Sequence, residues 1–225
     1  MPKPKDARIV ERLKAHVRKL SEEIGERNLD HYPQLEQVAD YITRQLEYCN
    51  YRVKFQEYTW EGKRVRNIIA RKWGSVSPDK VIVVGAHYDS VVTPGADDNA
   101  SGVAAVLELA RMLRNKPSRM SIEFCLFTNE EEPFFKTEVM GSHIFVRKAR
   151  AEAKDIRAVV VFDMIGYYSD KINSQRYFPL ITGLFLPNRG NFISLWSNLR
   201  SVDLSNFLIR SFQKNSRFSI VLLAS

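Results

Sequence analysis

The sequence predicts an α/β fold in which a mostly parallel, twisted sheet carries helices on both faces. Two short apolar runs, residues 81–84 and 158–162, are rich in valine, as strands buried on both faces are. Segments with the helical spacing of apolar residues, 103–113 and 141–151, alternate with such strands. This alternation favours βαβ units and therefore a parallel sheet.

The N-terminal quarter is predicted to be helical and to lead into a hairpin. From residue 6 to about residue 50, apolar residues recur at three- and four-residue steps. Residues 51–60 and 64–73 are rich in β-branched and aromatic residues, so we expect two strands joined by a turn at 61–63.

The later elements continue the alternation up to residues 171–191, which we interpret as a long loop. In chain order, we expect a loop at 74–79, a strand at 81–84, a helix at 103–113, a strand at 121–128, a helix at 141–151, a strand at 158–162, a mostly helical segment at 191–214 and a strand at 218–224.

The composition is that of a soluble globular protein. With 225 residues, 44% of them hydrophobic and 27% charged, the chain suits one domain over residues 1–225. No apolar run reaches the ~18 residues of a membrane helix, and the basic start lacks the apolar core of a secretory signal. We expect a cytoplasmic protein by default, and a secreted or periplasmic one if a signal was removed. The two cysteines, Cys49 and Cys125, are expected to be buried thiols.

The net charge of +8 is unevenly distributed. Residues 1–20 carry seven basic and two acidic side chains, and residues 171–225 carry seven and one, which leaves the middle at 20 minus 23, or −3. A nucleic-acid binder usually has a basic stripe or a recognisable module. An acidic centre fits a cation site better than a phosphate site, so we expect no nucleic-acid partner.

Polar side chains gather where three predicted strands end. The strand at 81–84 runs into His87 and Asp89. The next two strands run into an acidic segment at 130–132 and into Asp163. Because open α/β sheets form their sites at the carboxyl ends of the strands, these side chains are candidates for one functional site.

Asp97 and Asp98 lie in the loop after the first of these strands. Each cluster has an ordinary explanation by itself: a hydrogen-bonded histidine, a turn or helix cap, or acids at a helix start. Together, the carboxylates would repel one another unless a divalent cation lies between them. One imidazole with carboxylates suits zinc, manganese or cobalt, and a bridging carboxylate would hold two ions ~3.5–4 Å apart.

Four motifs stand in order within residues 35–170. They are His87-Tyr-Asp-Ser, Gly95-Ala-Asp-Asp-Asn-Ala-Ser-Gly, Asn129-Glu-Glu followed by Gly141-Ser, and Asp163-Met. Together they resemble the co-catalytic zinc aminopeptidases, family 28 of the metallopeptidases, whose relatives include bacterial leucyl aminopeptidase and glutamate carboxypeptidase. The resemblance implies the zinc-exopeptidase, phosphorylase/hydrolase-like fold.

The resemblance also implies a set of metal ligands. His87 and Asp163 would hold one zinc ion, and Glu131 would hold the second. Asp97 would bridge both ions, and its peptide bond to Asp98 is expected to be cis.

The same resemblance implies the catalytic groups and the reaction. Glu130 would be the general base that takes a proton from the attacking water and passes it to the leaving amine. Asp89 would accept the second N–H of His87 and orient the ring. The function implied is that of a zinc-dependent exopeptidase, an aminopeptidase acting on peptides or small amino-acid derivatives.

One expected ligand has no counterpart in this sequence. The family's second zinc also takes a histidine from the C-terminal part, whereas the histidines here are His16, His31, His87 and His143. The three other than His87 are expected at the surface. We therefore expect that the C-terminal portion of the domain is missing, or that a natural short form holds the second ion weakly or not at all.

Three other functions stay open. The missing histidine favours a catalytically impaired chain or a non-catalytic binding module on the same fold. A single-zinc enzyme similar to glutaminyl cyclase is disfavoured by the paired Asp97 and Asp98. A binder of nucleic acid or another acidic polymer through the basic ends is the weakest interpretation.

Overall fold

A computed structural model describes residues 4–175 and 187–224 of the chain. The chain divides into two compact units, Met1–Gly166 and Tyr167–Ser225, and each is described by itself. The single domain predicted for residues 1–225 stays a prediction.

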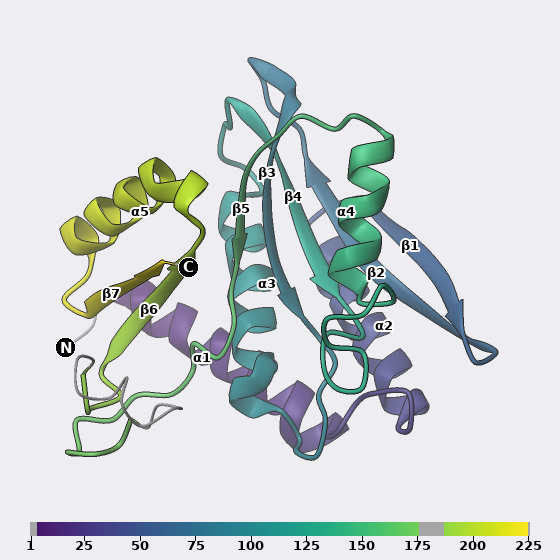
Figure 1. Ribbon diagram of the computed structural model, residues 1–225, viewed down its shortest axis with the longest axis horizontal. Helices are drawn as coiled ribbons and strands as arrows, with labels where there is room; N and C mark the ends of the chain where they lie inside the picture. Colours follow the sequence, from purple (N-terminus) through teal and green to yellow (C-terminus); the bar gives the residue numbers. More distant parts are fainter. Residues whose placement is uncertain (1–3, 176–186, 225) are drawn as a thin grey trace. The chain divides into compact units, whose positions relative to one another are not determined.

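A five-stranded sheet forms the centre of the first unit, in the order β1-β2-β4-β3-β5 (Figure 1). Its strands are β1 (Val53–Trp60), β2 (Lys63–Lys72), β3 (Ser77–His87), β4 (Met120–Phe127) and β5 (Ile156–Val161). β4, β3 and β5 are parallel neighbours, and β2 is antiparallel to both β1 and β4. Since only β2 runs in the opposite direction, the sheet is mostly parallel, as predicted.

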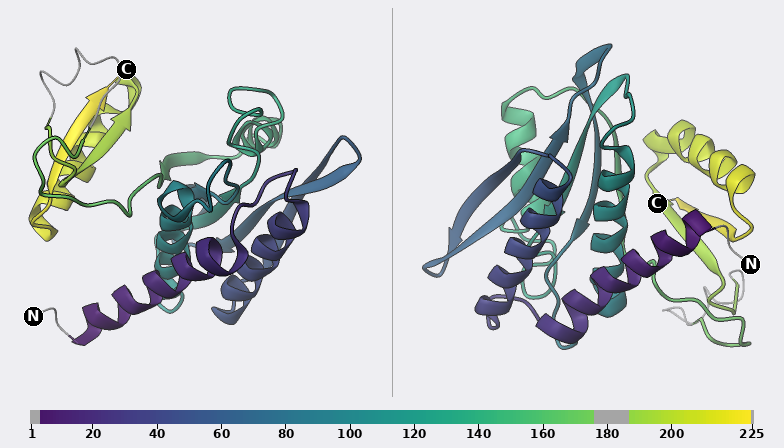
Figure 2. Two further views of the ribbon diagram at one scale, coloured as in Figure 1. Left: turned by 90° about the horizontal axis from the view of Figure 1, so that it is seen from below. Right: turned by 180° about the vertical axis from the view of Figure 1, so that it is seen from behind.

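Helices cover both faces of this sheet. They are α1 (Pro4–Arg18), which continues into a π-helical turn (Lys19–Ile24), then α2 (Tyr32–Tyr48), α3 (Gly102–Leu113) and α4 (Gly141–Ala151). Figure 2 shows α4 on one face and α2 and α3 on the other. The predicted α/β fold with helices on both faces is confirmed.

The side chains of the strands alternate between the two faces, as a pleated sheet requires. Val84, Phe124 and Leu126 belong to the main core, which includes residues of α2 and α3. Val83 and Phe127 pack instead in a smaller cluster that contains Phe145 of α4. Both cysteines are buried free thiols, as expected.

The prediction that the strand at 158–162 is buried is wrong. In β5 half-buried residues alternate with exposed ones, and the side chains of Val159 and Val161 are 52% and 53% exposed. Val159 is the register partner of Val83, which faces α4. Because α4 packs over β2 and Phe127, the outward valines of β5 stay exposed.

The second unit contains a two-stranded parallel sheet and a helix. Its elements are β6 (Phe192–Ser197), a 3-10 turn (Leu199–Ser201), α5 (Val202–Asn215) and β7 (Ser219–Ala224). The predicted strand at 218–224 is confirmed, but the helical prediction for 191–214 is wrong at its start. Residues 192–197 are apolar enough to pair with β7, and this long-range pairing overrides the local pattern. The loop predicted at 171–191 lies partly outside the described residues.

The histidines outside the site differ from expectation in one case. His31 and His143 are exposed, as expected. His16 is buried, with Nδ1 2.7 Å from the hydroxyl of Tyr41 and Nε2 3.7 Å from a carboxylate oxygen of Glu108. None of the helices in the described ranges is long and apolar enough to cross a membrane.

We expect Phe124→Ala to destabilise the fold by about 3–5 kcal/mol, because the fully buried ring would leave a cavity in the main core. Urea unfolding followed by circular dichroism measures the change. Val76→Ala is the control, since Val76 is 58% exposed and its truncation should change the free energy of unfolding by less than ~0.5 kcal/mol. Equal shifts for both variants would contradict the assignment of the core.

Candidate metal centre

The carboxyl ends of three parallel strands bring the polar side chains together. His87 is the last residue of β3 and pairs in register with Phe127, the last residue of β4. Gly85 pairs with Val161 at the end of β5, so Asp163 follows at the same edge. The turn after β4 carries Glu130 and Glu131 to this edge as well.

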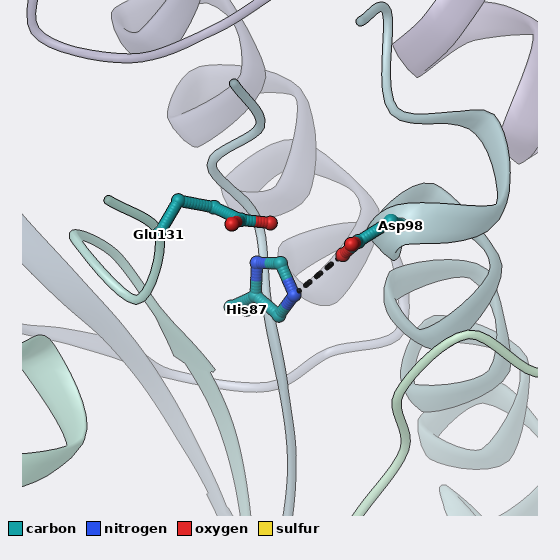
Figure 3. Close-up of side chains that lie close together, drawn as sticks. All are labelled: His87, Asp98 and Glu131. Carbon is teal, nitrogen blue, oxygen red and sulfur yellow. Dashed lines mark ion pairs between the residues drawn. The ribbon is translucent and has the colours of Figure 1, made fainter. Parts of the chain in front are cut away.

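Three side chains form a compact group that could hold a metal ion. One potential ligand atom each from His87, Asp98 and Glu131 lies within 4.8 Å of the others. Figure 3 shows the carboxylates of Asp98 and Glu131 directed toward the imidazole. Nε2 of His87 lies 3.0 Å from Oδ1 of Asp98 and 3.6 Å from Oδ1 of Asp163. Asp163 is therefore beside this group without being part of it.

Asp97, the predicted bridging residue, lies outside this group. Oδ1 of Asp97 accepts a 2.6 Å hydrogen bond from the N–H of Gly166 and lies 3.3 Å from the hydroxyl of Ser101. These bonds direct its carboxylate to the segment after β5, whereas its neighbour Asp98 faces His87. The cis peptide bond likewise joins Asp98 to Asn99, and not Asp97 to Asp98.

The loop that presents Asp98 is fixed by the side chain of Asn99. This buried amide donates to the carbonyl of Phe162 (2.9 Å) and accepts from the N–H of Gly102 at the start of α3 (2.9 Å). Gly95 begins the turn with φ 60°, and a Cβ there would collide with the carbonyl oxygen of Asp98. The same segment therefore forms a turn and a helix cap through Gly95 and Asn99, and it also carries Asp98 of the candidate site.

Like charges crowd the group and shift its pKa values. Burial lowers the pKa of His87, but the carboxylates of Asp163, Asp89 and Asp98 outweigh it and raise the value to about 12. Burial and the charge of Asp98 raise the pKa of Glu131 to about 7. His87 lowers the pKa of Asp98, against its burial. This cluster binds a proton strongly, and its one imidazole and hard oxygen donors also suit a divalent cation.

Asp89 connects His87 to the turn after β4. Its Oδ2 accepts hydrogen bonds from the N–H groups of Glu130 (2.9 Å) and Glu131 (3.1 Å). Its Oδ1 lies 3.5 Å from Nδ1 of His87, while its main-chain carbonyl oxygen is closer, at 3.2 Å. The predicted contact with the imidazole is thus shared with the backbone, and the carboxylate mainly holds the turn.

Glu130 lies beside the metal group with its carboxylate held at the start of α4. Its two oxygens accept from the N–H (2.6 Å) and the hydroxyl (2.8 Å) of Ser142. Burial raises the pKa of Glu130, the bonds from Ser142 oppose this, and the charge of Asp89 adds to it. Glu130, Asp163 and the metal group line one cavity of about 340 Å³.

Arg27 is a supporting residue that no sequence motif identifies. It is fully buried, and its guanidinium donates to five main-chain carbonyls, those of Leu20, Gly25, Tyr88, Pro94 and Gly95. Burial lowers its pKa to about 10, and the charges of Asp89 and Asp98 oppose this. Arg27 therefore fixes both ends of the loop that connects His87 to Asp98.

The sequence of this chain is similar to those of several known proteins. Residues 67–183, just over half of the chain, match the model of peptidase family M28. Protein YfbL of Escherichia coli, which is described as uncharacterized, is 34% identical over 203 residues that cover 86% of this chain and 61% of that protein. A probable aminopeptidase of Saccharomyces cerevisiae, YDR415C, is 31% identical over 147 residues, covering 59% and 37%. The chain thus spans less than two thirds of these curated relatives.

Two solved structures from Bacteroides thetaiotaomicron have the same fold. A leucine aminopeptidase precursor superposes with a TM-score of 0.67 at 18% identity, covering 96% of this chain and 76% of that one. A glutaminyl cyclase superposes with a TM-score of 0.65 at 18% identity, covering 95% and 75%. At this identity the likeness shows the fold alone.

The contrast between neighbouring aspartates can be tested with isosteric variants. We expect Asp98→Asn to weaken zinc binding about tenfold or more, because it removes a charged ligand. Asp97→Asn should bind zinc nearly as the unmodified protein does, because an amide oxygen can still accept from Gly166 and Ser101. Competition with a chromophoric chelator measures both. A larger loss for Asp97→Asn would restore the original assignment.

We expect Arg27→Lys to lower both the melting temperature and the affinity for zinc, because one ammonium cannot replace a fork that donates to five carbonyls. Thermal unfolding and chelator competition measure the two effects. Arg64→Lys is the matched control, since the side chain of Arg64 is 59% exposed and should be tolerated. Unchanged zinc affinity in Arg27→Lys would show that the loop does not depend on Arg27.

Proposed function

The chain belongs to peptidase family M28, and from this premise we propose that its site is that of a zinc-dependent exopeptidase, an aminopeptidase that hydrolyses the N-terminal peptide bond. The observation that carries the proposal is that His87, Asp98 and Glu131 form one group of potential metal ligands. Glu130 lines the same cavity and is not one of these ligands, so its carboxylate is free to act as a base. The relative named as a probable aminopeptidase supports the same reaction class.

His87, Asp98 and Glu131 would hold the zinc, with Asp163 as a further ligand beside His87. Asp98 interacts with both His87 and Glu131, so it would take the role first given to Asp97, and the proposal includes two ions that would share Asp98. Bound zinc would supply Lewis-acid activation of water and of the scissile carbonyl.

Glu130 would act as the general base. A carboxylate with a raised pKa accepts a proton more readily at neutral pH, and Glu130 combines burial with a position in the wall of the same cavity. Ser142 holds both of its oxygens, so the carboxylate keeps one orientation. Having taken the proton of the attacking water, Glu130 would pass it to the leaving amine. Asp89 would hold the backbone of Glu130 and Glu131 in place by accepting hydrogen bonds from their N–H groups.

The glutaminyl cyclase alternative and the non-catalytic alternative make different predictions. A cyclase would release ammonia from an N-terminal glutamine without cleaving the peptide. A binding module would hold zinc and peptide without turnover. Asp163 adds a further carboxylate beside the group of His87, Asp98 and Glu131, and this favours a two-ion peptidase over a single-zinc cyclase. Glu130 in the wall of the same cavity favours turnover over binding alone.

We expect Glu130→Gln to lower the kcat for release of an N-terminal leucine by ~100-fold or more while zinc binding persists, because the amide cannot accept a proton. The assay uses zinc-loaded protein and a leucyl peptide, with chelator-treated protein as the blank. Glu152→Gln, at the far end of α4 from Ser142, is the control and should leave kcat unchanged. Full turnover by Glu130→Gln would eliminate the proposed base, and ammonia release without cleavage would favour the cyclase.

A further inference from the structure

A second, larger cavity adjoins the one at the metal group. It measures about 550 Å³ and is lined by residues 28–30, by Trp60, Glu61 and Lys63 at the tip of the β1–β2 hairpin, and by part of the loop after β4, Asn129, residues 131–134 and residues 137–139. Glu131 and Glu132 line both cavities. A peptide bound at the metal group could therefore extend into this second space.

The wall of the second cavity combines apolar surface with an excess of negative charge. Trp60 and Phe134 meet edge to face, with ring centroids 5.8 Å apart. The cavity is lined by six acids against one lysine, Lys63, whose ammonium donates to the carbonyl of Leu29 at 2.6 Å. The acids are Asp30, Glu61, Asp89, Glu131, Glu132 and Glu138.

An unsatisfied donor in the same wall also indicates a ligand. Asn129 is 2% exposed, and its side-chain Nδ2 has no hydrogen-bond partner among the described residues. Leaving a buried amide N–H unpaired is unfavourable, whereas a ligand carbonyl could satisfy it after a small side-chain rotation. Asn129 lines the second cavity and not the first, so this donor serves an occupant of the second.

We propose that the second cavity binds the basic side chain of a peptide substrate, arginine or lysine, with an adjacent peptide carbonyl held by Asn129. These side chains have an apolar stem that suits Trp60 and Phe134 and a cationic end that suits the acids. A guanidinium also gains from the face of a tryptophan. The inference rests on the proposed function, because it assigns the substrate class of the same peptidase.

Binding can be tested apart from turnover with two probes of nearly equal shape, N-acetyl-arginine amide and N-acetyl-citrulline amide. Calorimetric titration is done on metal-free and zinc-loaded protein at low ionic strength. We expect the cationic probe to bind about tenfold more tightly, with the preference reduced by added salt. Equal affinities for the two probes in the unmodified protein would overturn the proposal.

Two variants test whether the acids on the rim of the second cavity cause the preference for arginine over citrulline. Neutralising Glu61 and Glu138 together, both exposed on the cavity rim, as Glu61→Gln/Glu138→Gln should reduce the arginine preference about fivefold. Glu57→Gln is the control, since Glu57 stands on the same hairpin, is exposed and does not line the cavity. A preference that survives the double variant, or falls equally with Glu57→Gln, would place the cation elsewhere and overturn the proposal.

Kinetics separates this inference from the peptidase proposal. Peptides with arginine or citrulline at either of the first two positions are compared by kcat/KM. Cleavage with a preference for arginine supports both proposals. Cleavage without discrimination overturns the inference and leaves the peptidase proposal standing. A binding preference for arginine with no cleavage of any peptide supports the cavity's preference and overturns the peptidase proposal.

Discussion

The crowding of carboxylates around one imidazole is the constraint on which the rest of the site depends. Asp98 and Asp163 approach Nε2 of His87, and Asp89 approaches Nδ1. Such a group is stable only when positive charge lies within it, because like charges at short range repel strongly where water is excluded. The parallel strands β3, β4 and β5 create this crowding, since their carboxyl ends meet at one edge of the sheet.

The surrounding fold offsets this repulsion with main-chain groups more than with ion pairs. Asp89 accepts hydrogen bonds from two backbone N–H groups, and Glu130 accepts one from the N–H of Ser142 at the start of α4. Arg27 contributes its charge from a distance, while its donors are used on main-chain carbonyls. These fixed N–H groups bind carboxylate oxygens without filling the space between the carboxylates. That space stays available for a cation.

The sequence predicted the elements with a clear period and the strand ends that carry the site. It could not separate Asp97 from Asp98, because adjacent residues in a loop differ only in the direction set by distant partners such as Gly166. The role of Arg27 was hidden for the same reason, since its partner carbonyls at Tyr88, Pro94 and Gly95 lie more than 60 residues away. Residues 192–197 were misassigned because a strand partner outweighed the local pattern.

The pKa of His87, raised to about 12, means that its imidazole carries a proton at neutral pH in the ion-free site. A metal ligand must be deprotonated, so an incoming divalent cation displaces this proton. Glu131, whose pKa is raised to about 7, is partly protonated at neutral pH, so it would also release protons when the ion binds. Metal uptake is therefore also a release of acid, and it is opposed as the solution becomes more acidic. A site of this kind couples the binding of metal to the surrounding pH through the protons of His87 and Glu131.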